Sequence, residues 1–266
     1  MKGRGQRTKV GFAVTAFCVV AFAQPQKSEN AAVQLEFASV IQRMEQAQRN
    51  AKPQGPYQVI RQYQLLESNS SHVSSNVVAE IEYSPPDRET YVIQERRGSS
   101  RGEQVVRQIL DHESALVAGG PASWSAALLT RDNYSFTNLG ESTLDGKSFY
   151  LLGLVPKRKE KELIAGRAWV DKNTFLIRRI EGEMAKSPSW LLKRVSVRLD
   201  FSEFSGVWLQ SAMEATADVR LVGSQTLQAQ TLDCRKADVV AARIDPKHAQ
   251  TIHRGVPAEL LFPAAK

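Results

Sequence analysis

Residues Arg194 to Leu221 read RVSVRLDFSEFSGVWLQSAMEATADVRL and carry two runs in which apolar and polar residues alternate. Successive side chains of a strand point to opposite faces, so each run predicts a strand with one dry face and one solvated face. Ser205-Gly206 lies between the runs and predicts a tight turn, which makes the pair an antiparallel hairpin. The dry face of the first strand is formed by Val195, Val197, Leu199 and Phe201.

The same alternation continues along the chain in both directions. Asp145-Gly146 is a strong signal for a two-residue hairpin, and Asp171-Lys172-Asn173 marks another turn. Pro85-Pro86 ends an earlier strand, because proline cannot donate a hydrogen bond to a neighbouring strand. The pattern therefore predicts a long antiparallel meander with strands at 57–65, 77–83, 88–96, 134–141, 147–155, 163–171, 174–182, 190–203, 206–221 and 224–235.

Two segments repeat their apolar residues with helical rather than strand spacing. In residues 31–49, Phe37, Ile41 and Met44 fall on one helical face, and residues 103–117 show the same period. A shorter helix is expected at 124–129, and polar loops are expected at 68–75 and 97–101. Because strand twist accumulates, a sheet of this size curls towards a barrel, and its dry concave face needs a cover. We predict an α+β, mainly β fold, in which a curved antiparallel sheet forms an incomplete β-barrel lidded or plugged by amphipathic helices.

The first 23 residues predict a secretory signal peptide. Four basic residues precede an uncharged, mostly apolar stretch from Val10 to Ala23, which ends in the cleavage pattern Ala21-Phe22-Ala23. This stretch is shorter than the roughly 20 residues that span a bilayer. We therefore expect cleavage after Ala23 and a periplasmic mature protein; an uncleaved N-terminal anchor is the alternative.

Net charge bears on the class of partner, and the cysteine count bears on disulfide bonds. Loss of the signal lowers the formal net charge from +7 to +3, which gives no reason to expect a nucleic-acid partner. Cys18 leaves with the signal, so Cys234 remains alone and cannot form an intramolecular disulfide. Its place in a strand pattern predicts a small buried apolar side chain.

The motifs that would indicate an enzyme are missing. Gly146-Lys147-Ser148 resembles the end of a phosphate-binding loop, but it lies between two strands and the preceding glycine is misplaced. Asp111-His112-Glu113 looks like a metal site on paper, yet adjacent helical residues point in different directions. We therefore expect no enzymatic activity, no metal site and no cofactor.

The order of elements resembles the outer-membrane lipoprotein carrier (LolA-like) superfamily. An N-terminal amphipathic helix is followed by strands, a second helix and a long meander. GESTLDGKSFYLLGLVP at Gly140–Pro156 resembles that family's hairpin with a DG turn, and GRAWVDKNTFLIRRI at Gly166–Ile180 resembles the next hairpin. SGVWL, at residues 205–209, resembles a later turn and strand entry. The resemblance covers roughly residues 30–235.

This resemblance implies a periplasmic protein that shelters acyl chains or lipoproteins in an apolar cavity, acting as a monomer. It implies a half-barrel domain over residues 24–241 with a C-terminal extension at 242–266. The alternative is an envelope protein-interaction or stress-sensor module on the same fold, which would use Trp124, Trp190 and the basic segment Arg96–Arg101. The candidate lining residues are Phe37, Ile41, Met44, Val195, Val197, Leu199 and Phe201.

Overall fold

The computed structural model describes residues 26–66, 72–189, 192–220 and 223–236. The chain divides into two units, residues 1–36 and 37–266, which are taken separately here. In the first unit the described residues, 26–36, are helical and open helix α1, which runs from Gln26 to Asn50. The predicted signal peptide and the C-terminal extension lie outside the described residues.

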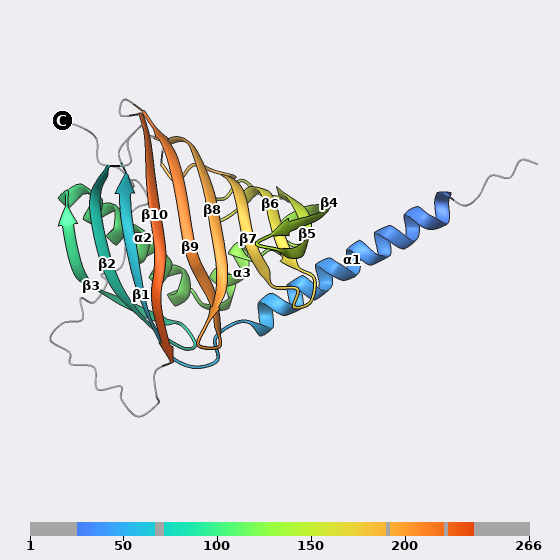
Figure 1. Ribbon diagram of the computed structural model, residues 1–266, viewed down its shortest axis with the longest axis horizontal. Helices are drawn as coiled ribbons and strands as arrows, with labels where there is room; N and C mark the ends of the chain where they lie inside the picture. Colours follow the sequence, from blue (N-terminus) through green and yellow to red (C-terminus); the bar gives the residue numbers. More distant parts are fainter. Residues whose placement is uncertain (1–25, 67–71, 190–191, 221–222, 237–266) are drawn as a thin grey trace, which may run out of the picture. The chain divides into compact units, whose positions relative to one another are not determined.

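The second unit is built on an open, curved, ten-stranded antiparallel sheet (Figure 1). The strands follow the order β3-β2-β1-β10-β9-β8-β7-β6-β5-β4, so every neighbour except the β1–β10 pair is also a neighbour in sequence. Two further helices follow β3, α2 (Ser100–Ala118) and α3 (Gly120–Ala127). The strands are β1 (Tyr57–Leu66), β2 (Val73–Ser84), β3 (Arg88–Gly98), β4 (Tyr134–Leu144), β5 (Lys147–Pro156), β6 (Ile164–Asp171), β7 (Ile177–Met184), β8 (Leu192–Phe204), β9 (Val207–Val219) and β10 (Gly223–Lys236).

The predicted fold class is confirmed, and the meander follows the predicted strands closely. The turn residues explain the agreement: Asp145 and Gly146 both have positive φ, as do Ser205 and Gly206, and this conformation suits two-residue hairpins. β7 begins three residues later than predicted. The Asp171 carboxylate accepts hydrogen bonds from the backbone N–H groups of Asn173 and Thr174, which prolongs the turn.

Three connections differ from the prediction. Residues 73–75 belong to β2 rather than to a loop, because Ser75 is paired both with Leu65 of β1 and with Gly98 of β3. The expected loop at 97–101 is absent, because β3 continues to Gly98 and α2 begins at Ser100, capped by the Ser99 hydroxyl. The short helix starts at Gly120 rather than at 124, with Pro121 in its first turn.

Residues paired across neighbouring antiparallel strands point to the same face, so the pairings trace one row of inward side chains across the sheet. This row runs through Leu152, Ala168, Ile180, Leu199, Met213, Ala229, Tyr63 and Val77. Its first members pack with Met44 of α1, and its last members pack with Leu110 of α2. Both helices therefore cover the same face of the sheet, which we call the inner face.

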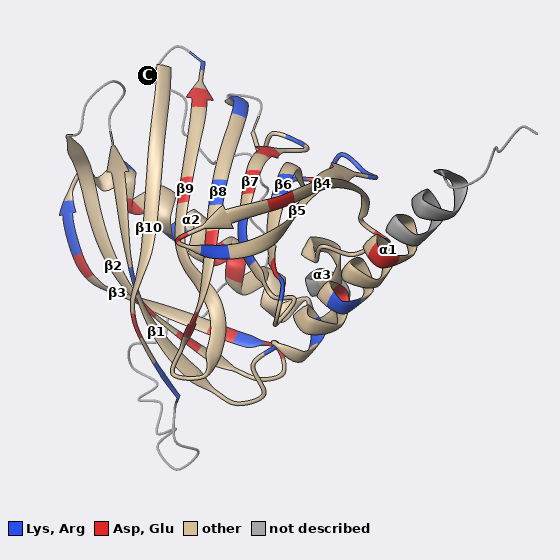
Figure 2. Cartoon of the chain, turned by 45° about the vertical axis from the view of Figure 1, so that its right-hand side comes forward, with Lys and Arg blue, Asp and Glu red and all other residues tan. Residues whose placement is uncertain are grey.

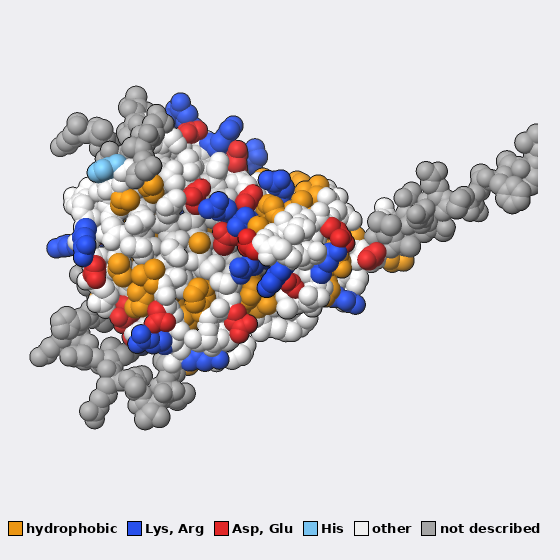
Figure 3. All heavy atoms as spheres, in the orientation of Figure 1, with side chains coloured by type: hydrophobic (Ala, Val, Ile, Leu, Met, Phe, Trp, Pro, Cys, Tyr) orange, Lys and Arg blue, Asp and Glu red, His pale blue; other side chains and the backbone are white. Residues whose placement is uncertain are grey.

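The outer face of the central strands is polar. Gln58 donates a hydrogen bond to Glu80, and Arg179 pairs with Asp200 at 2.6 Å. Charged residues recur along β7, β8 and β9 (Figure 2). On the side of the sheet away from α2, hydrophobic side chains gather only in small groups (Figure 3). The sheet thus has the one dry and one solvated face that the alternation predicts.

Candidate functional site

The inner face carries separate buried clusters rather than one continuous core. One cluster joins α2 to β1, β2 and β10 and includes Leu110, Tyr63 and Ala79. A second joins the end of α1 to β5, β6 and β7 and includes Met44, Leu152 and Ala168. Leu199 and Met213 are cross-strand partners, yet they pack against different clusters. The boundary between the two clusters therefore runs along the middle of the sheet.

The side chains at this boundary are only half-buried. We call the strip formed by Gly182, Val197, Leu199, Met213 and Ala215 the central trough. These residues are inward members of two adjacent cross-strand rows on β7, β8 and β9. Fully packed cores bury such side chains, as they bury Leu152 and Tyr63 here at 1% exposure each. The trough is thus an apolar surface that the two clusters adjoin and leave partly accessible.

A pair of glycines makes one wall of the trough bare. Gly166 and Gly182 are direct partners on β6 and β7, and Gly182 is in turn paired with Val197. A Cβ atom on Gly182 would lie 2.2 Å from the Ala165 carbonyl oxygen, and one on Gly166 would lie 2.0 Å from that of Glu181. Only glycine fits where the two backbones approach so closely. The pair leaves peptide backbone, rather than side chains, beside Val197.

The predicted lining residues divide into two groups. Phe37, Val197, Leu199 and Phe201 are half-buried, and each packs at the edge of a cluster. Ile41, Met44 and Val195 are buried, with exposures of 3%, 0% and 7%. The structure brings Phe37, Ile41, Met44, Leu199 and Phe201 together in the cluster under α1, whereas Val195 and Val197 belong to a third small cluster with Leu192 and Ala217.

The end of α1 is held by hydrogen bonds at the margin of its cluster. The Glu45 carboxylate accepts bonds from the backbone and the guanidinium of Arg131, at 2.7 Å and 3.2 Å. Burial alone would raise the pKa of Glu45, but these bonds and the Arg131 charge outweigh it and hold the pKa below its usual value. Gln48 bonds to both the N–H and the carbonyl of Leu129.

The contact between α2 and the sheet contains charges instead. Arg61 lies on the inner face of β1, and its Nη1 atom lies 3.2 Å from Oε2 of Glu113 on α2 and 3.4 Å from the Tyr63 hydroxyl. Glu89 of β3 accepts a 3.4 Å hydrogen bond from Ser114 of α2. Burial, followed by the nearby Glu113 charge, raises the pKa of Glu89 to about 7.

Sequence patterns did not indicate this group of charges. They predict no metal site at Asp111-His112-Glu113, but they do not show that Glu113 pairs with Arg61. The signal was Arg61 itself, because it holds an inward position between Val59 and Tyr63 on a strand whose inward residues are otherwise apolar. A buried arginine needs an anionic partner, but the sequence does not say which of the distant carboxylates supplies it.

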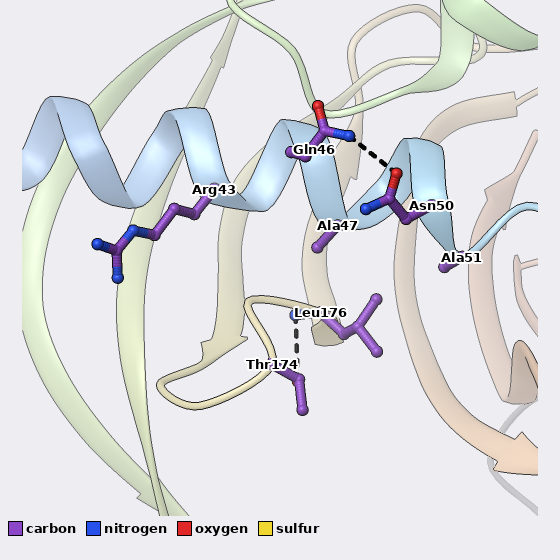
Figure 4. A pocket seen from close by; sticks show the side chains of 7 residues that line it. All are labelled: Arg43, Gln46, Ala47, Asn50, Ala51, Thr174 and Leu176. Carbon is purple, nitrogen blue, oxygen red and sulfur yellow. Dashed lines mark hydrogen bonds between the residues drawn. The ribbon is translucent and has the colours of Figure 1, made fainter.

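An open hollow of about 430 Å³ lies between the end of α1 and the loop that joins β6 to β7. Ala47 and Ala51 line it from the helix, and Thr174 and Leu176 line it from the loop (Figure 4). Gln46 and Asn50 are hydrogen-bonded to each other at 2.8 Å (Figure 4). Ala47, Ala51 and Leu176 give the hollow apolar contacts, and its polar groups come from Arg43, Gln46, Asn50 and Thr174.

The other residues that the sequence singled out form no further site in the part of the chain that the structure describes. Trp190 and the Trp124 side chain lie outside what the structure describes. Arg96 and Arg97 pair with Glu103 and Glu95, so their charge is partly neutralised. Cys234 is buried, as expected. Within the described ranges, no cluster of histidine, cysteine or acidic residues could hold a metal ion, and no helix has an apolar stretch long enough to cross a membrane.

Part of the chain matches a family model, and the chain is similar to several solved structures. A family model described as an uncharacterized protein matches residues 127–236, which is less than half of the chain. A search of the curated proteins finds no match. Among solved structures, the chain is similar to a DUF1329 family protein from Desulfovibrio piger, with 17% identity, a TM-score of 0.42 and coverage of 76% of this chain and 93% of that one.

Two further solved structures carry the family name that the sequence resembles. One is an outer membrane lipoprotein-sorting protein domain from Vibrio parahaemolyticus, with 11% identity, a TM-score of 0.39 and coverage of 76% and 94% of the two chains. The other is a LolA superfamily protein from Nitrosomonas europaea, with 11% identity, a TM-score of 0.34 and the same coverage. The chain is thus similar to solved structures that carry the name of the superfamily it resembles in sequence.

Proposed function

We propose that this protein is an exported, periplasmic binding protein that shelters acyl chains or lipoproteins in the central trough and catalyses no reaction. The half-buried state of the trough carries the proposal. Its Leu199 and Met213 side chains lie between two closed clusters without joining either completely, and Val197 lies at the edge of the third, small cluster. Covering such a surface with hydrocarbon is favourable by about 0.8 kcal/mol for each methylene removed from water.

The seven predicted lining residues take different parts in this proposal. Phe37, Val197, Leu199 and Phe201 are accessible enough to touch a chain laid along the trough. Ile41, Met44 and Val195 would support those contacts from beneath. At Gly166 and Gly182, a chain laid beside Val197 would meet peptide backbone rather than a side chain.

The experiment is native mass spectrometry of the mature full chain purified gently from the periplasm, with lipid extraction of the same sample. We expect a stoichiometric acyl-bearing species. Palmitate and shorter saturated fatty acids then serve as probes in solution. Affinity should fall by up to about fourfold for each methylene removed, because each loses about 0.8 kcal/mol of burial. A clean apo mass with no uptake of added palmitate or lipopeptide would overturn the proposal.

Two variants localise the binding to the trough. Leu199→Gln makes the trough polar, and Leu232→Gln is its matched control, because Leu232 of β10 is 50% exposed and packs in neither cluster. Palmitate binding should be lost in the first variant and kept in the second. Ala215→Leu fills the trough floor without adding a polar group, so it tests the same site should Leu199→Gln fail to fold.

A second candidate function, the envelope protein-interaction module, is favoured by the open edge at β4. This strand pairs only with β5, carries Glu141 as its one charged residue and exposes Leu139 at 48%, and β5 exposes Val155, the partner of Ser135, at 54%. Exposed edges pair readily with extended segments of other proteins. Thr137→Pro in β4 would then abolish capture of an envelope protein and leave palmitate binding unchanged, whereas a lipid carrier would show no such loss.

A further inference from the structure

The attachment of α2 to the sheet contains a charge imbalance. Arg61 of β1 pairs with Glu113 of α2 at 3.2 Å, and Glu89 of β3 accepts a 3.4 Å hydrogen bond from Ser114, the next residue of α2, so the charges of Arg61 and Glu113 both act on Glu89. The Nε atom of Arg61 is buried and has no hydrogen-bond partner. One positive charge thus serves two carboxylates, Glu89 and Glu113, of which Glu113 keeps 30% of its side chain exposed, and the hydrogen-bonding capacity of Arg61 is not fully used.

The groups that face Glu89 come from every element packed around it. β1 contributes Arg61 and the hydroxyls of Tyr57 and Tyr63, and β2 contributes Tyr83, the cross-strand partner of Glu89. α2 contributes Glu113 and the Ser114 hydroxyl. Burial raises the pKa values of the three tyrosines, so they stay neutral at physiological pH. Arg61 is therefore the attractive charge acting on Glu89 in this group.

We propose that α2 is held to β1, β2 and β3 by a proton on Glu89, and that ionisation of Glu89 weakens this attachment by repulsion from Glu113. With Glu89 neutral, Arg61 and Glu113 form a balanced ion pair beneath the helix. With Glu89 ionised, the contact holds one unbalanced negative charge away from water. Releasing α2 returns both carboxylates to solvent and relieves this cost.

The direction of the pH effect follows from linkage. The pKa of Glu89 is about 7 with the helix attached and returns towards 4.5 when the group is solvated. The attached state therefore binds more protons between these two values, so attachment is strongest below about pH 4.5 and weakens as pH rises towards 7. Above about pH 7 no further change is expected from this group.

Hydrogen exchange of the mature full chain, read by mass spectrometry, measures this directly. After correction for intrinsic rates, the protection of α2 relative to residues 40–50 of α1 should fall about 10-fold or more between pH 5 and pH 8. Glu89→Gln should keep α2 protected at both pH values. Glu95→Gln, an exposed carboxyl on the same strand, is the matched control and should behave as the wild type.

Two results would overturn the inference: constant relative protection of α2 in the wild type, or a fall that persists in Glu89→Gln. If Glu89→Gln does not fold, Glu113→Gln tests the same repulsion, because ionised Glu89 can then pair with Arg61 without a competing carboxylate. The weakening of the α2 attachment should then disappear near neutral pH.

One consequence rests on the proposed function, because Met213 of the central trough packs against the cluster that α2 covers. Palmitate affinity should then change between pH 5 and pH 8 in the wild type and stay constant in Glu89→Gln. Absence of palmitate binding at every pH would remove the proposed function and leave the exchange result intact. A pH-dependent affinity in both proteins would instead show that Glu89 does not control the trough.

Discussion

The two helix-covered halves of the inner face are equally buried but differently attached. Under α1, the cluster is apolar throughout, with Met44, Leu163 and Val170 at 0% exposure, and its ion pair between Glu45 and Arg131 lies at the margin. Under α2, Leu110 is also at 0% exposure, yet Arg61, Glu89 and Glu113 lie within the contact. The same kind of amphipathic helix is thus fixed in one half by packing and in the other by packing together with a titratable group.

This difference shows that burial alone does not determine how a helix is attached to the sheet. An apolar contact responds little to pH, whereas a buried carboxylate with too little positive charge near it makes its contact depend on a proton. Acid should therefore act on the halves in opposite directions. It removes the Glu45 contact of α1 and strengthens the contact of α2.

The largest expected effect comes from truncating one fully buried side chain in each half. Met44→Ala and Leu110→Ala each remove a fully buried side chain, and each should lower the free energy of unfolding by about 2–5 kcal/mol. Urea unfolding followed by circular dichroism measures both. Met44→Leu, which keeps most of the volume, should cost less than about 1.5 kcal/mol.

The double variant sharpens the comparison. Because the two clusters are distinct, the losses should add to within about 0.5 kcal/mol. A clear excess or deficit would mean that the central trough couples the halves into one core, which would contradict the division described above.

Adding a methyl group at Gly182, in the trough between the two halves, should have the next largest effect on stability. Gly182→Ala places a Cβ against the Ala165 carbonyl oxygen, so the β6 and β7 backbones must separate, at a cost of about 1–3 kcal/mol. Urea unfolding checks this value. Gly55→Ala is the control, because a Cβ there meets no atom within 4 Å; equal losses in the two variants would contradict the close approach at Gly182.

In the half covered by α2, the third effect is a difference in the free energy of unfolding that depends on pH. The stability gained by Glu89→Gln over the wild type should be near zero at about pH 4.5 and reach about 1–3 kcal/mol at about pH 7, because the wild type loses its bound proton over this interval. Denaturation at a series of pH values measures it. A difference of constant size across the series would contradict the proposed titration.

The smallest effect is expected at the margin of the α1 half. Glu45 has a lowered pKa, so its contribution is present above its usual pKa near 4.5 and is lost as pH falls through the lower value of the folded state. Glu45→Gln should therefore cost less than about 1 kcal/mol at pH 7, and the cost should decrease as pH falls below 4.5. A larger cost in acid than at neutral pH would reverse the assigned sign.

Much of the fold could be predicted because strand periodicity and turn chemistry are local. The alternation from Val195 to Phe201 and the Ser205-Gly206 turn are contained in neighbouring residues, and they identify both a strand and its partner. Ser75 and Arg97 were misassigned because their strands form through pairing with distant residues rather than through their own sequence preference.

The site was harder to predict, because its character depends on contacts between distant segments. Leu199 and Met44 look alike in sequence as apolar residues on a dry face, and only packing separates the half-buried residue from the fully buried one. Bulges add to the difficulty. The irregular pairing next to Arg61 skips Leu232, so Leu232 is exposed although Cys234, two residues later, is buried.

The pairing of β1 with β10 also bears on how the chain folds. Tyr57 lies opposite Lys236, so most of the described chain separates these two partners. In every other pair of neighbouring strands, the two strands follow each other directly in the sequence. Bringing distant segments together costs more chain entropy and comes late in folding. During synthesis, β1, β2 and β3 emerge first but lack their remaining neighbour until β10 has followed. The meander from β4 to β10 is thus the part that can assemble step by step, and it completes the strand on which the earlier hairpins dock.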